Sequence, residues 1–90
     1  MAEIAPNSTG NHSVQVGSLK LCIVSLTLVT TGDTYTIEPN APVVDFWTQT
    51  HLGNSTGYNL DTTWTASTGA FTFYTDQALG LTSLFILLRT

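Results

Sequence analysis

The chain has 90 residues, of which 42% are hydrophobic and only 9% are charged, with two basic residues against six acidic ones. This length predicts a single domain. The lack of a basic patch argues against a nucleic-acid-binding role, because neutralising phosphate groups takes several Lys or Arg side chains. No apolar run approaches the length of a membrane helix, and residues 1–18 lack the features of a signal peptide, so we expect no membrane association.

The low charge also predicts that this protein is part of an assembly. A globular domain usually carries about 25% charged residues, and a mixed charged surface keeps free monomers soluble. Here Lys20 and Arg89 are the only basic residues. Cys22 is the only cysteine, so no internal disulfide can form, and no Cys/His cluster offers a zinc site. We therefore expect stabilisation by partner chains, such as a homo-oligomer, and no cofactor.

Residues 1–13 are polar and irregular and predict an extended N-terminal arm, followed by a domain over residues 14–90. Because the arm is too polar to supply core, we expect it to hold the protein in its assembly, with Ile4 and Pro6 as contact residues. The alternative is that the arm packs along its own domain.

The rest of the chain predicts an all-β fold, because β-branched and aromatic residues dominate and no window holds a helical apolar pattern. The longest candidate strand covers 19–28, where apolar residues change from odd to even positions near Ile23. Such a change indicates a bulge or a strand that switches its buried face. Further strands are predicted at 34–37 and 43–50, the latter with Val44 and Phe46 on one face and Val43, Asp45 and Trp47 on the other.

After a loop at 53–59, residues 60–66 and 71–74 predict a hairpin around 67–69, and residues 81–89 the last strand. The run from 84 to 88 is wholly apolar, which indicates a strand buried on both faces. Its second face, including Phe85, meets either a loop or another subunit. In all, about seven short antiparallel strands are expected, in a β-sandwich or barrel.

No set of residues predicts catalysis. His51 precedes a loop and could approach Asp45 or Asp61, but a loop histidine bonded to backbone is the simpler interpretation. The aspartates lack the spacing of a calcium loop. Asp45 lies inside a strand, with Lys20 or Arg89 as its possible salt-bridge partners. Trp47 and Trp64 are expected in the core or in an interface, with a sugar-stacking platform as the alternative.

The order of these segments resembles a known group of proteins. The segments are a polar arm, LKLCIVSLTLV, TGDTYTIEP, VVDFW, the hairpin TTWTASTGAFTFYT and the apolar LTSLFILLRT. Together they resemble the small all-β structural proteins of tailed bacteriophages, especially capsid decoration (cement) proteins.

The resemblance implies a non-enzymatic protein on the outside of a virion, often a trimer, that bridges and stabilises major capsid subunits. The acidic balance agrees with a position away from packaged DNA. Three alternatives stay open: a tail, neck or baseplate component, a carbohydrate- or surface-binding β-module, and a designed or secreted adhesin-like β-domain.

Overall fold

The computed structural model describes residues 2–50, 59–76 and 78–90. It confirms the all-β prediction, with seven strands and no helix among the described residues. The strands are β1 (His12–Val16), β2 (Leu19–Leu28), β3 (Asp33–Thr36), β4 (Val43–Thr50), β5 (Leu60–Thr65), β6 (Ala70–Thr75) and β7 (Gly80–Arg89). Accordingly, no described helix is long and apolar enough to cross a membrane.

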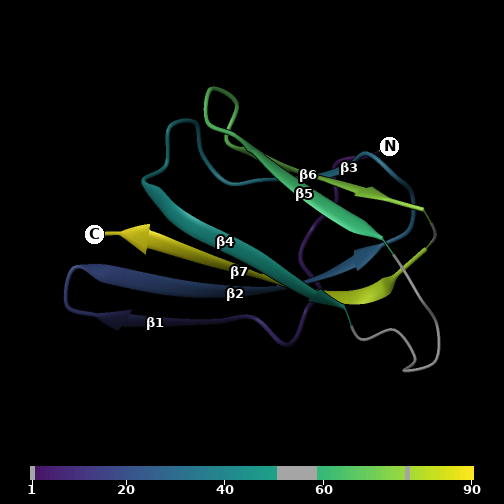
Figure 1. Ribbon diagram of the computed structural model, residues 1–90. Coiled ribbons are helices and arrows are strands. Elements are labelled where there is room, and N and C mark those ends of the chain that lie inside the picture. The colour runs from purple at the N-terminus through teal and green to yellow at the C-terminus, as the bar shows by residue number, and fades with distance from the viewer. Residues whose placement is uncertain (1, 51–58, 77) are drawn as a thin grey trace.

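The strands form two antiparallel sheets that pack face to face as a sandwich (Figure 1). One sheet has the order β1-β2-β7-β4 and the other β3-β6-β5. The long strands β2 and β7 lie at the centre of the first sheet, so its middle is made from two segments far apart in the sequence.

The core lies between the sheets and is built mainly from side chains at alternate positions along the strands, which point inward. Phe71 and Phe73 of β6 are fully buried, and the Phe71 ring meets Phe46 of β4 edge-on, with centroids 5.2 Å apart. The buried cluster comprises Val24, Leu26, Leu28, Phe71, Phe73, Leu79, Leu84 and Ile86.

The bulge expected near Ile23 is wrong, because β2 pairs with β7 without interruption from Leu19 to Leu28. The odd and even apolar positions of β2 simply face opposite sides of one strand. The register shift lies in β4 instead, between Val43 and Asp45. As a result Val43 packs against the core with Phe46, and not on the side of Asp45 and Trp47 as expected, while Val44 is exposed.

The N-terminal segment lies on its own domain, which was the alternative prediction for the arm. The backbone N–H of Ile4 donates to the Thr34 carbonyl (2.7 Å), and the N–H of Thr34 donates to the Ala2 carbonyl (2.8 Å). Further along, the N–H of Asn7 donates to the Ser25 carbonyl of β2 (2.8 Å). The segment therefore joins the two sheets, and the domain boundary expected after residue 13 falls inside β1, a strand that was not predicted.

Two carboxylates hold this segment in place. Burial alone would raise the pKa of Glu3, but hydrogen bonds from Thr34 and Thr36 outweigh this effect and lower it. Asp33 is buried, and burial would likewise raise its pKa; hydrogen bonds from the Thr30 hydroxyl and amide and the Val29 amide lower it. The Ala2 amide also donates to Asp33 (3.1 Å).

Candidate interaction surface

The side of the four-stranded sheet that faces away from the core carries an unusual number of apolar side chains. Along β7, Leu84 and Ile86 point into the core, so Phe85 and Leu87 point to the opposite side. The β2 register sets Ile23 opposite Phe85 and Leu21 opposite Leu87 on that side. We call this side the outer face, defined by Val14, Val16, Leu19, Leu21, Ile23, Trp47, Leu81, Phe85 and Leu87.

Strand β1 extends the outer face at one edge of the sheet. Its register places Val14 opposite Leu21 and Val16 opposite Leu19. These four side chains and Leu87 line a hollow of about 290 Å³ whose walls are almost entirely apolar. Val16 is 73% exposed, so the hollow opens to solvent in the isolated chain.

At the other edge, β4 adds an aromatic pair to the outer face. Trp47 lies opposite Phe85, and their rings stack with centroids 5.3 Å apart and an interplanar angle of 4°. Trp47 remains 45% exposed. The structure thus brings together two of the residues that the sequence proposed for an interface, on a side of the sheet where the described N-terminal segment covers only the neighbourhood of Ser25.

The other proposed interface residues lie elsewhere. Trp64 faces the core from β5 and contacts Phe71, with ring centroids 4.6 Å apart. Ile4 packs against the core from the N-terminal segment, while Pro6 beside it is exposed. Of the five, only Trp47 and Phe85 belong to the outer face.

Sequence reasoning missed the aliphatic part of this surface. Val14 and Val16 were not assigned to a strand, although they alternate with polar Ser13 and Gln15. That alternation is the signal of a half-apolar strand. The alternation of Leu19, Leu21 and Ile23 predicts a buried face, whereas these side chains lie on the side of the sheet that faces away from the core.

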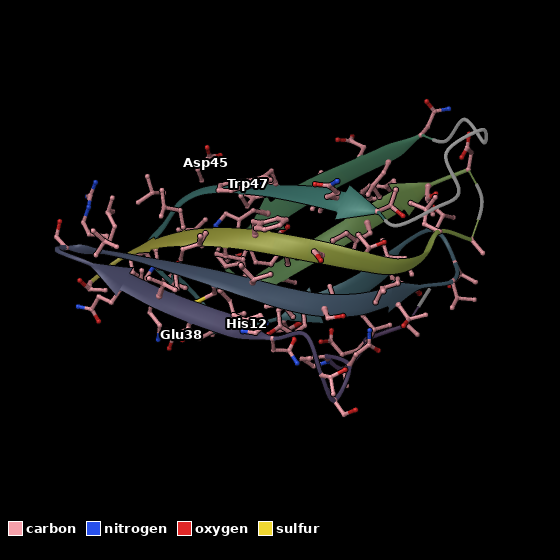
Figure 2. All side chains as sticks on the ribbon, turned by 90° about the horizontal axis from the view of Figure 1, so that it is seen from below. His12, Glu38, Asp45 and Trp47 are labelled. Carbon is pink, nitrogen blue, oxygen red and sulfur yellow. The ribbon has the colours of Figure 1, made fainter. Side chains whose placement is uncertain are left out.

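Two charged groups flank the outer face. The pleat places Asp45 on the same side as Trp47, and Arg89 on the same side as Leu87. Figure 2 looks onto this side, with Asp45 and Trp47 along β4 and His12 on β1 at the far edge. Neither charge has an ion-pair partner in the described part of the chain, and the Asp45 carboxylate accepts only the neighbouring Phe46 amide (2.8 Å).

A second hollow, of about 380 Å³, opens between the two sheets. Cys22, Tyr35 and Glu38 contribute its polar groups, and aliphatic side chains form the rest of its lining. Burial raises the pKa of the Tyr35 hydroxyl, and the nearby Cys22 and Glu3 groups raise it further. The hydroxyl is therefore a poor base at neutral pH.

The described residues hold no candidate metal centre. No group of three or more His, Cys, Asp or Glu side chains is close enough to hold a metal ion there. His51, the histidine considered for catalysis, lies outside the described residues. Lys20 and Arg89, considered as partners of Asp45, form no salt bridge with it among those residues.

Comparison of the chain with protein-family models, with curated proteins and with solved structures found no match.

Proposed function

We propose that this protein is a structural component of a virion, of the capsid decoration (cement) kind, which binds the outside of the major capsid shell and stabilises it. The observation that carries the proposal is the outer face. Five of the eight large apolar side chains most exposed among the described residues lie on it: Val14, Val16, Leu19, Trp47 and Leu81. Monomeric proteins rarely expose contiguous apolar patches beyond a few hundred Å², and larger ones mark interaction sites.

The composition supports contacts of this chemistry. With two basic and six acidic residues in the chain, attraction between opposite charges can supply little of the binding energy. Stacked aromatic rings and aliphatic side chains bury apolar area, which is the main source of affinity in permanent assemblies. Binding through the outer face should therefore persist in high salt.

The proposal is tested by comparing particles that carry the protein with particles stripped of it. Release of the genome on heating is followed at low and at high salt. Bound protein should raise the release temperature in both, and Trp47→Ala should abolish the protection while Thr63→Ala, an exposed change on the other sheet, leaves it intact. Equal release temperatures with and without the protein would reject the cement role.

A tail, neck or baseplate position would use the same surface with a different partner. Antibody labelling of intact particles in electron micrographs separates the positions, because decoration of the shell and of the tail give different images. Labelling confined to the tail would support a tail, neck or baseplate component and reject the cement role.

One observation favours a carbohydrate-binding module as the second candidate. Tyr74 is 50% exposed and borders a shallow hollow of about 420 Å³, together with Asn59, Asp61 and Asp76. An exposed ring beside amide and carboxylate groups can stack on and hydrogen-bond to a sugar. Loss of glycan-array binding on Tyr74→Ala, with Trp47→Ala unaffected, would support this candidate over a cement role.

A further inference from the structure

The size of the outer face suits pairing with another protein surface. Strands rise about 3.3 Å per residue and lie about 4.8 Å apart. For two strands of 10 residues, one of 8 and one of 5, the whole of this side of the sheet measures at most about 500 Å² in projection. Two such surfaces together bury at most about 1,000 Å², the lower bound for a specific interface.

The two charges that flank the outer face make it complementary to itself. Asp45 lies opposite Leu87, and Arg89 follows two residues later on the same side of β7. The acid and the base therefore lie near one end of the face, on neighbouring strands, and neither forms an ion pair within the described chain. When a surface with one acid and one base meets its own copy about a twofold axis, each acid can be set against the base of the other copy.

We propose that the outer face binds the outer face of a second copy of this chain, with Asp45 of each copy against Arg89 of the other. The two four-stranded sheets then pack about 10 Å apart, as stacked sheets do. The stacked rings of Trp47 and Phe85 and the hollow between β1 and β2 become buried in the interface. A twofold arrangement yields two equivalent ion pairs at the rim and an apolar centre, the usual anatomy of a protein interface.

This inference rests on the proposed role of the outer face as a protein interface, but it does not require a capsid. The pairing applies to the free protein, because a shell subunit that binds the outer face must displace the second copy. The charge pattern favours the copy because the copy necessarily supplies one base and one acid in matching positions, whereas an unrelated surface need not.

The test is sedimentation equilibrium of the purified full chain from about 1 µM to about 1 mM, the range in which a weak-to-moderate pair dissociates. The unmodified chain should associate to a dimer. Asp45→Arg and Arg89→Asp should each raise the dimer dissociation constant by about tenfold or more, because like charges then face each other twice. Asp61→Arg, an equal charge change on the exposed side of β5, is the matched control and should change nothing.

An equimolar mixture of the two single variants gives the sharper result. One variant carries two bases at these positions and the other two acids, so they should recover dimerisation with each other while each remains monomeric alone. The double variant should dimerise like the unmodified chain. Circular dichroism of every variant separates loss of pairing from loss of fold.

Several outcomes would overturn the inference. These are a monomer at about 1 mM, a trimer, or single variants that dimerise as well as the unmodified chain. A monomer whose Trp47→Ala variant still loses capsid protection would reject the self-pairing while leaving the proposed function standing. A dimer whose charge variants pair as expected, but which does not protect a shell, would reject the proposed function and leave the self-pairing standing.

Discussion

Gly69 packs against the peptide group of Glu38 so closely that no side chain fits between them. A Cβ atom added at Gly69 would overlap the Glu38 carbonyl group and lie 2.7 Å from the Pro39 nitrogen. The Gly69 carbonyl also accepts the Ile37 amide (2.8 Å), and the residue has φ = +76°, a conformation that favours glycine. The β5–β6 hairpin and the chain leaving β3 thus approach each other most closely at Gly69, and the Asn40 amide, which donates to the Ala66 carbonyl (2.7 Å), joins them a second time.

Replacing Gly69 with alanine should therefore lower the free energy of unfolding by about 3 kcal/mol or more, since a backbone clash adds to the strain of positive φ. Gly17→Ala is the matched control, because Gly17 has φ = +60° but no atom within 4 Å of an added Cβ. It should cost about 1 kcal/mol. Urea unfolding of both variants measures the difference, and equal losses would show that the close approach to Glu38 is unimportant.

The two tryptophans should respond differently to truncation. Trp64→Ala removes a ring that packs on the core against Phe71 and should cost about 3 kcal/mol of stability. Trp47→Ala removes an exposed ring that stacks only on Phe85 and should cost about 1 kcal/mol in the monomer. Thermal unfolding at low protein concentration tests this. A larger loss for Trp47 would mean that the outer face is covered even in the isolated chain.

Acid should destabilise the fold through Glu3 and Asp33. Both carboxyl groups have folded pKa values below their ordinary values of 4.5 and 3.8. A lowered folded pKa gives stability that is complete above the unfolded pKa and is lost as the pH falls through the folded pKa. The unfolding midpoint should therefore stay constant from about pH 7 to about pH 5 and fall below about pH 4.

Asp33→Asn tests the assignment of this acid sensitivity. In this variant an NH2 group, which is a hydrogen-bond donor, replaces one carboxylate oxygen. It would face either the N–H groups of Val29 and Thr30 or the Ala2 N–H and the Thr30 hydroxyl, which are themselves donors. The variant should lose about 2 kcal/mol at neutral pH and show a shallower fall in acid. An unchanged acid profile would assign the sensitivity to other carboxyl groups.

Removal of residues 2–11 should lower stability, contrary to the expectation of an arm that serves only the assembly. Hydrogen bonds from Ala2, Ile4 and Asn7 to β3 and β2, together with the packing of Ile4, would be lost. We expect a loss of about 3 kcal/mol, with Pro6→Ala as the neutral control at an exposed site. An unchanged unfolding midpoint would show that the segment does not stabilise the domain, as expected for a free arm.

The all-β class could be predicted because it depends on local patterns that the chain repeats in most segments. Prediction from local patterns fails at position 44. Nothing in the sequence Val43-Val44-Asp45 distinguishes a bulge from regular alternation, because the bulge is set by the pairing of β4 with β7. The strand at His12–Val16 is short and exposed along its whole length, so the alternation of two valines with polar residues is its only signal in the sequence.

The candidate surface was only half visible in the sequence for a similar reason. Each aromatic residue is a candidate for an interface by its type alone, which singles out Trp47, Phe85 and Trp64. The fold then directs Trp64 to the core and leaves Trp47 and Phe85 stacked on the outer face. The assignment of Leu21 and Leu87 to the same open surface depends on the β2–β7 register and on a second sheet that covers only one side. Neither can be deduced from the composition.

The central position of β7 also has a consequence for the order in which the protein is made. Leu19 pairs with Arg89 and Leu28 with Gly80, so the middle of the larger sheet joins early and late segments of the chain. During synthesis β2 and β4 have no strand between them until β7 leaves the ribosome. Such long-range pairing makes folding slow, typically milliseconds to seconds. Unpaired strand edges in the nascent chain are then prone to aggregate, so the yield of folded protein should depend on chaperones and on translation speed.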